Sequence, residues 1–287
     1  MTKAVLTMGK KASAVGPLVK GITDERFFFS YGNQIPDLTE FDTTYWMAGI
    51  FAMRLQAMGL AKNLSSPGEK WLAEIDTALT QRKIYEGTLD DLGNFDSTST
   101  FWIKPSEAKI HDMPAGKYSY PIVKEIFERN DYTLPISLQW TDSVLPMNYE
   151  HRFFVLDGEV VTGSTYLVDG KVWNPFIDTS KYEEAKKFAE YVLKSVPTPQ
   201  AFTLDVALNE ADDTWLVIEG NRAWSSGIYG SNPGLALEVI RASNHATNWL
   251  WTPDEHVLFL NEKINPVEIV PLSEIDSADF YEYQLEG

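Results

Sequence analysis

The residues best suited to binding a metal ion lie in two apolar segments in the last third of the chain. The first, FTLDVAL, contains Asp205, and the second, WLVIEGN, contains Glu219 and Asn221. Glu219 and Asn221 are two positions apart, so on a strand they share one face, and a paired strand can bring Asp205 to the same face. Two carboxylates and an amide oxygen form a hard ligand set that suits Mg²⁺.

A simpler alternative is that both acidic residues lie on a solvated face of a sheet, as most acidic strand residues do. Here, however, apolar residues flank both acids, which predicts buried strands. These neighbours are Leu204, Val206, Val217 and Ile218. A buried carboxylate that lacks a cation or a donor costs several kcal/mol. The pattern therefore favours a cation at this position.

Three basic residues upstream could bind phosphate. Lys104 ends the strand-like run TFWIK, and Lys117 lies in a polar loop after it. A lysine at the end of a buried strand can place its ammonium group in a cleft, although a lone lysine is more often a snorkelling surface residue. Arg152 is followed by apolar residues and needs an anion. That anion is either Glu150, in a structural ion pair, or a terminal phosphate.

Hydrophobic periodicity places these residues on strands. The strands that we expect span residues 4–8, 98–104, 134–140, 150–156, 159–168, 202–208 and 215–219. Asp157-Gly158 predicts a hairpin between two of them, and the acidic turn 209–213 predicts that the last two pair antiparallel.

Helical spacing alternates with these strands. The helices that we expect span residues 42–63, 66–83, 122–129, a segment from Ser180 to Pro197, and 233–249. Ser180 and Glu183 predict a capping box at the start of the fourth helix. Residues 9–16 read as a loop, and the acidic segment after Lys263 as a solvated arm. This order predicts an α+β fold with a ligand cleft between two sheet-bearing lobes.

Composition excludes several classes of function. The net charge of −17 disfavours nucleic acid as a partner, and the absence of cysteine removes thiolate nucleophiles and cysteine-based zinc sites. No apolar run is long enough to span a bilayer or to form a signal peptide, so we expect no membrane partner and a cytoplasmic protein. The four histidines lack metal-ligand spacing, and no Gly-x-Ser-x-Gly motif occurs. A homodimer stays open.

Taken in order, these motifs resemble the ATP-grasp superfamily, especially its compact phage and bacterial members. The resemblance covers residues 98–249 and depends on FWIKP, YEHRFFVLDGEVVTGSTY and FTLDVALNEADDTWLVIEGN. It implies an ATP-grasp fold with a pre-ATP-grasp lobe at 1–95 that shapes the substrate site. It further implies a small lobe at 96–142, a large lobe at 143–270 and an acidic tail at 271–287.

The resemblance also implies a role for each candidate residue. Lys104 and Lys117 would contact the α- and β-phosphates of ATP, with Lys109 as the alternative to Lys117. The strand 136–140, including Gln139 and Trp140, would meet adenine and ribose together with Asp142. Arg152 would hold the γ-phosphate and an acyl phosphate. One or two Mg²⁺ ions would bind Asp205, Glu219 and Asn221. Arg222 would grip a substrate carboxylate, unless it is a surface arginine.

The implied activity is that of an ATP-dependent ligase. Phosphoryl transfer from ATP to a small-molecule or peptide carboxylate would give an acyl phosphate, which an amine, or a thiol, would attack. If a phage encodes the protein, it would work in the host cytoplasm. Two alternatives stay open: a small-molecule kinase on the same fold, and a nucleotide-binding module without turnover.

Overall fold

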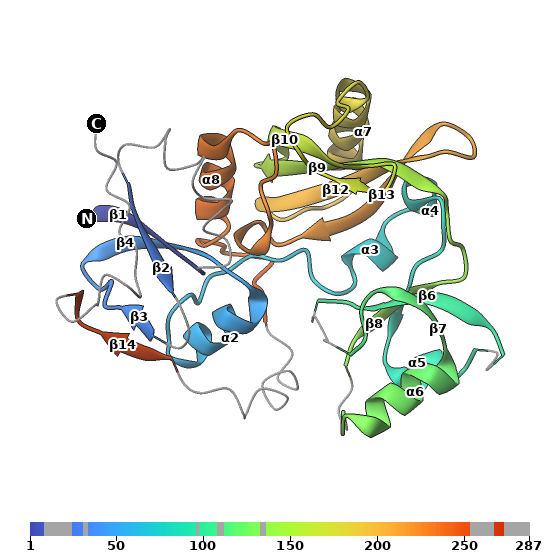
Figure 1. Ribbon diagram of the computed structural model, residues 1–287, viewed down its shortest axis with the longest axis horizontal. Coiled ribbons are helices and arrows are strands. Elements are labelled where there is room, and N and C mark those ends of the chain that lie inside the picture. Colours follow the sequence, from blue (N-terminus) through green and yellow to red (C-terminus); the bar gives the residue numbers. More distant parts are fainter. Residues whose placement is uncertain are drawn as a thin grey trace.

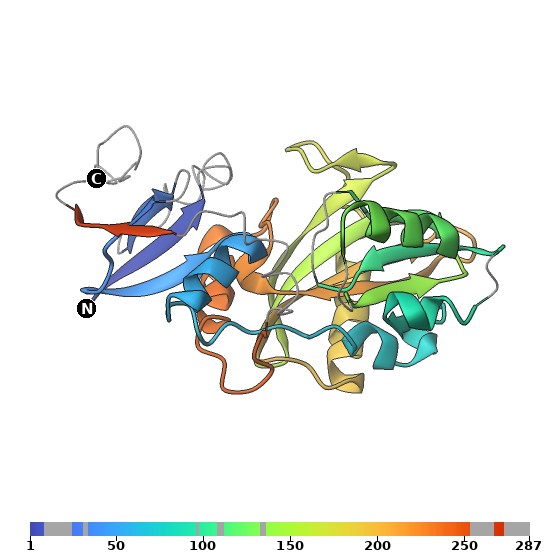
Figure 2. The same cartoon turned by 90° about the horizontal axis from the view of Figure 1, so that it is seen from below.

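The computed structural model describes residues 1–8, 25–30, 34–95, 98–107, 112–132, 136–252 and 267–272. They form three lobes: a parallel sheet at one end, a large antiparallel sheet in the middle and a small antiparallel sheet at the other end (Figure 1). A view turned by 90° shows the same order (Figure 2). Among the described helices, none is long and apolar enough to cross a membrane. The mixture of sheets and helices confirms the expected α+β class.

The first lobe is built on a parallel sheet with the strand order β2-β1-β4. Its strands are β1 (Thr2–Met8), β2 (Glu25–Ser30) and β4 (Phe41–Trp46), beside a separate pair of β3 (Gln34–Pro36) and β14 (Glu268–Val270). Helix α2 (Gly49–Ala57) contributes Phe51 and Leu55 to the core of this lobe. Helix α8 (Pro233–Ala242), from much later in the chain, joins the same core.

The large sheet has the strand order β11-β10-β9-β12-β13. Its strands are β9 (Met147–Leu156), β10 (Glu159–Val168), β11 (Lys171–Val172), β12 (Ala201–Asn209) and β13 (Thr214–Asn221). The predicted hairpin is confirmed: Asp157 and Gly158 connect β9 to β10 with φ of 52° and 78°, as a type I′ turn requires. Helix α7 (Tyr182–Ser195) covers one face, which carries Phe153, and α8 packs on the other, which carries Phe154.

A β-bulge in β13 decides which side chains face the cleft. Asp205 pairs with Glu219, but the next residue, Val206, pairs with Val217, so Ile218 is the extra residue. The bulge shifts the alternation of the strand. Val217 packs in the core under α7, whereas Glu219, only two positions later, lines a cavity on the other face. If the same residues formed a strand without a bulge, both side chains would point to the same side.

The small sheet has the strand order β5-β8-β6-β7. Its strands are β5 (Tyr85–Gly87), β6 (Thr100–Pro105), β7 (Gly116–Ser119) and β8 (Leu138–Thr141). Helices α5 (Leu89–Leu92) and α6 (Tyr120–Arg129) share a core with one face of this sheet. Because β5 and α5 precede residue 96 and yet join this sheet, the division of the chain at 95 stays a prediction. The short helices α3 (Trp71–Glu74) and α4 (Thr77–Thr80) contact β13.

Three expected helices differ from the structure. Residues 42–46 belong to β4, because Thr44 and Trp46 alternate into the core while the strand pairs with β1, and the helix begins only at Gly49. The expected helix 66–83 is reduced to α3 and α4, since Ile75 between them is extended. The last helix ends at Ala242, where the Asn244 side chain instead bonds both backbone groups of Tyr45.

The predicted capping box is also wrong. Helix α7 begins at Tyr182, and its N-cap residue, Lys181, makes no side-chain capping bond. Ser180 donates its hydroxyl and backbone N–H to Asp178 instead, which ends the preceding turn. The expected loop at 9–16 lies outside the described residues, as does most of the acidic tail.

Candidate active site

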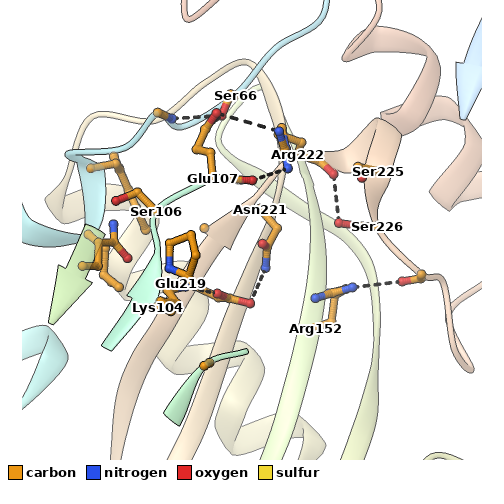
Figure 3. A pocket seen from close by; sticks show the side chains of 18 of the residues that line it. Ser66, Lys104, Ser106, Glu107, Arg152, Glu219, Asn221, Arg222, Ser225 and Ser226 are labelled. Atoms are coloured by element: carbon orange, nitrogen blue, oxygen red, sulfur yellow. Dashed lines mark hydrogen bonds and ion pairs between the residues drawn. The ribbon is translucent and has the colours of Figure 1, made fainter. Parts of the chain in front are cut away.

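A cavity of about 610 Å³ opens where the large sheet, the small lobe and the segment before α3 meet. The charged residues that line it come from three strands or the turns that follow them: Lys104 and Glu107 from β6, Arg152 from β9, and Glu219 and Arg222 from β13. In Figure 3 these side chains point toward one another across the cavity. The convergence places most of the predicted site residues in one space.

Two carboxylates meet at the floor of this cavity. Asp205 and Glu219 lie directly opposite each other on β12 and β13. The Nδ2 atom of Asn221 donates to Oδ2 of Asp205 at 3.0 Å and to Oε1 of Glu219 at 2.9 Å. One oxygen of each carboxylate is therefore aimed at a single positively polarised group. Such a pair, with the amide oxygen of Asn221 on the same side chain, fits the oxygen ligands that Mg²⁺ prefers.

The metal set is thus limited to two carboxylates and an amide. Within the described part of the chain, no group of three or more histidine, aspartate or glutamate side chains is arranged to hold a metal ion. A cation bound here would need further oxygens from water or phosphate, which agrees with the usual habit of Mg²⁺.

Arg152 holds Asp205 in a two-pronged ion pair. Its Nε atom donates to Oδ1 at 2.8 Å and its Nη2 atom to Oδ2 at 2.6 Å. The Asp205 side chain is fully buried and that of Arg152 is 11% exposed. Burial alone would lower the pKa of Arg152, but the carboxylate beside it raises it, so the guanidinium stays charged. The anion that the sequence demanded for Arg152 is therefore Asp205, and the expected structural pairing with Glu150 is wrong: Glu150 instead accepts the Tyr166 hydroxyl at 2.5 Å.

Lys104 holds the second carboxylate. Its ammonium group donates to Oε2 of Glu219, and both side chains are partly exposed to the cleft. Burial would raise the pKa of Glu219, but Lys104 and the Asn221 amide lower it to about 2. Arg82, buried nearby, adds a further positive charge facing Glu219. Glu219 is consequently ionised at any physiological pH.

Arg222 is a buried cation at the junction of three segments. Its Nη2 atom donates to the carbonyl of Glu107 at 3.0 Å, and its Nη1 atom lies 3.8 Å from that carboxylate. Its guanidinium carbon lies 5.1 Å from the ring centroids of both Trp224 and Trp251. Ser66 donates its hydroxyl to the same glutamate. The alternative that Arg222 is a surface arginine is therefore wrong, since its side chain is 14% exposed.

A second cavity, of about 390 Å³, lies beside the first, between the small sheet and β13. The residues that line both cavities include Leu72, Lys104, Gln139 and Glu219. The Lys104–Glu219 ion pair therefore stands at their junction. The second cavity is walled mainly by apolar side chains, and the strand β8 with its following linker forms one side of it.

The remaining predicted residues have different positions. Gln139 lines both cavities and donates to the carbonyl of Glu69 at 2.7 Å, while Trp140 lines the second cavity although its ring packs in the core on Tyr85. Lys117 is exposed on β7 opposite Trp102, and Asp142 is exposed after β8. Neither lines the cavities described above. The alternative Lys109 lies outside the described residues.

Sequence reasoning missed several residues of the site. Ser66, Glu107 and Tyr229 line the first cavity, and Arg82 and Tyr166 line the second. They come from segments without a recognisable motif, and only their distant partners reveal them. A partial signal existed for Gly220, because a Cβ atom there would come within 2.9 Å of the Trp71 ring. That close approach explains a glycine between Glu219 and Asn221.

Comparisons with known proteins place this cleft in a family. A family model described as an ATP-grasp domain, family 2 of its clade, matches residues 79–239. The match spans more than half of the chain and includes both carboxylates, Lys104, Arg152 and Arg222. The chain belongs to the ATP-grasp superfamily, and it has the ATP-grasp fold. No curated protein matches the chain.

Several solved structures are similar at low identity. D-cycloserine synthetase DcsG is 12% identical, with a TM-score of 0.48 over 84% of this chain and 98% of that chain. A D-alanine–D-alanine ligase from Bacillus anthracis is 12% identical, with a TM-score of 0.45 over 84% and 97% of the two chains. One from Coxiella burnetii is 10% identical, with a TM-score of 0.46 over 90% and 97%.

Proposed function

We propose that the protein is an ATP-dependent ligase that activates a carboxylate as an acyl phosphate and joins it to an amine. The observation that carries this proposal is the meeting of two cavities at the Lys104–Glu219 ion pair. One cavity is mainly apolar and suits a nucleoside. The other is lined by Lys104, Arg152 and Arg222 and suits anionic substrate groups. Phosphate would pass from one to the other at their junction.

The nucleotide would lie in the second cavity with its phosphates toward Lys104. Gln139, Trp140 and the linker that contains Asp142 would border the adenine and ribose, and Lys117 would reach the phosphates from β7. Asp205, Glu219 and Asn221 would hold Mg²⁺, which supplies neutralisation of phosphate charge. The support for this arrangement is the shared direction of both carboxylates toward Asn221 Nδ2.

The substrate carboxylate would bind in the first cavity beside Arg152 and Arg222. Its oxygen attacks the γ-phosphorus, the bond to the β-phosphate oxygen breaks, and ADP leaves. The amine then attacks the acyl carbon, loses a proton, and releases inorganic phosphate. Arg152 would stabilise the transferring group, and Asp205 would keep its guanidinium in place. Every step uses positioning and charge, so no protein nucleophile takes part.

Arg222 has a more specific task in this scheme. Its side chain reaches the Glu107 carboxylate only at 3.8 Å, longer than the roughly 2.7–2.9 Å of a charge-assisted hydrogen bond. A substrate carboxylate could take that weak contact without breaking the 3.0 Å bond to the Glu107 carbonyl. Arg222 would then hold a second carboxylate or orient the acceptor.

The experiment is an ADP-release assay with panels of carboxylates and amines, run with and without hydroxylamine. Hydroxylamine attacks acyl phosphates, so the proposal expects a hydroxamate that depends on both carboxylate and ATP, with free phosphate released. A stable phosphate ester in place of free phosphate would indicate a kinase. ATP binding without ADP release across all panels would indicate a module without turnover. Either outcome would overturn the ligase assignment.

A further inference from the structure

The indole of Trp102 is exposed on the wall of the second cavity. It belongs to β6, whose neighbouring residues Phe101 and Ile103 are buried in the core of the small lobe. Trp102 is 41% exposed, against 6% and 0% for these two neighbours. Because side chains alternate along a strand, Trp102 shares its face with Lys104, and both line this cavity. A large aromatic ring therefore lies one strand repeat away from the ion pair at the junction.

The opposite wall of the cavity is aliphatic. Ile218, the extra residue of the bulge in β13, faces it from the large sheet, and Ile84 and Val144 border it. Within the described residues, Trp102 makes no aromatic ring contact of its own, in contrast to Trp140, which stacks on Tyr85. The cavity thus offers one flat aromatic face and one aliphatic wall from two different lobes.

Charge fixes the orientation of an occupant. The positive group of this cavity on β6 is Lys104, and Lys117 lies directly opposite Trp102 on the neighbouring strand β7. A planar ring on Trp102 would therefore have cations beside it on the same face of the sheet. An occupant with a flat apolar ring joined to phosphates matches both features.

The geometry points to Trp102 as the stacking surface for the nucleotide base, with Ile218 closing the other side of the ring. This inference rests on the proposed ATP-dependent function and adds to it a residue that determines base binding. It also gives the bulge a second consequence, because the extra residue provides one wall of the base site. Base closure would require both lobes, since Trp102 and Ile218 belong to different sheets.

The test separates base binding from phosphate binding. Affinities of wild type, Trp102→Ala and Trp102→Phe for Mg-ATP, adenosine and Mg-tripolyphosphate are measured by calorimetry. Aromatic stacking on a base is worth roughly 1–3 kcal/mol, so Trp102→Ala is expected to weaken ATP and adenosine by about tenfold or more. Tripolyphosphate binding should stay within about twofold. Trp102→Phe should recover most of the affinity, because it keeps a ring.

Trp173 provides a matched control. It is 37% exposed but lies after β11, outside the lining of this cavity. Trp173→Ala should bind all three ligands as the wild type does, and adenosine should quench tryptophan fluorescence less in Trp102→Phe than in Trp173→Phe. Wild-type affinity of Trp102→Ala for adenosine would overturn the inference while leaving ATP binding intact. A wild type that binds neither ATP nor tripolyphosphate would overturn the proposed function as well.

Discussion

Asp205 and Glu219 lie directly opposite each other on neighbouring strands, and each is bound by a different cation. Arg152 takes Asp205, and Lys104 takes Glu219. Like charges at directly opposed strand positions destabilise a sheet, so this pair requires compensation. The two cations and the shared Asn221 amide provide it. The arrangement implies that the site is near neutrality before any ligand binds, and its parts and supports can be tested separately.

The first prediction concerns the buried ion pair. Arg152→Met leaves the fully buried Asp205 carboxylate without its cation and should cost roughly 3–5 kcal/mol of unfolding free energy. Arg152→Met combined with Asp205→Asn removes both charges and should recover much of that loss. Urea denaturation of the two single variants and the double variant measures the coupling. Additive losses would contradict a direct pair. Both Arg152 variants should still lose about 10²–10³ in turnover, as removal of a preorganised donor does.

The second prediction isolates metal binding from stability. Glu219→Gln keeps the size of the side chain and removes the negative charge, so Mg²⁺-dependent ATP affinity should fall by about tenfold or more, the range known for partners of metal ligands. Titration calorimetry at several Mg²⁺ concentrations measures it. Glu238→Gln, on the exposed side of α8, is the matched control and should behave as wild type. If Glu219→Gln binds Mg-ATP normally, the metal lies elsewhere.

The third prediction concerns pH. His151 is 0% exposed on β9, and burial lowers its pKa from 6.5 to about 4. Its ring nitrogens have no hydrogen-bond partner within the described residues. The unfolded chain takes up this proton below about pH 6.5 and the folded chain only near pH 4. Stability is therefore fully retained above pH 6.5 and declines as pH falls toward 4, by roughly 3 kcal/mol in total.

His151→Phe should remove this pH dependence. Unfolding free energies measured between pH 7 and 4 should fall less steeply in the variant than in the wild type. The exposed His245 supplies the control, and His245→Gln should keep the wild-type slope. Equal slopes for His151→Phe and wild type would show that His151 titrates normally in the folded protein.

The fourth prediction concerns the glycine between Glu219 and Asn221. A Cβ atom at Gly220 would lie 2.9 Å from the Trp71 ring and 3.1 Å from Pro67. Gly220→Ala should therefore cost about 1–3 kcal/mol, as overpacking commonly does. Trp71→Leu is expected to relieve the clash, so the double variant should lose less than the sum of the single variants in thermal unfolding. Gly170→Ala is a poor control because of its φ of 70°. Gly234→Ala, with only a 3.6 Å contact, is a better one.

Strands could be predicted because their patterns are local. The alternation of apolar residues located β9, β12 and β13, and the Asp157-Gly158 pair located the hairpin. The helices failed where long-range contacts decide the structure. The run 42–46 forms β4 because β1 is beside it, and the last helix stops because Asn244 bonds Tyr45, a residue 199 positions away.

The site divides in the same way. Spacing by two correctly placed Glu219 and Asn221 on one face, and the buried neighbours of Asp205 correctly indicated a compensating cation. The partners of these residues could not be predicted. Glu107 and Ser66 meet Arg222 only in the folded chain, and the bulge at Ile218 has no mark in the sequence. The roles of the site residues in nucleotide and metal binding stay predictions.

The bulge allows the length of β13 to vary independently of the carboxylate pair. If Ile218 were deleted, Val217 and Glu219 would become adjacent and would point to opposite faces of a regular strand. Val217 would still pack beneath α7, and Glu219 would still oppose Asp205. The second cavity alone would lose a wall. Homologous chains one residue shorter at this point should therefore keep both acids and differ in what they accept beside Trp102.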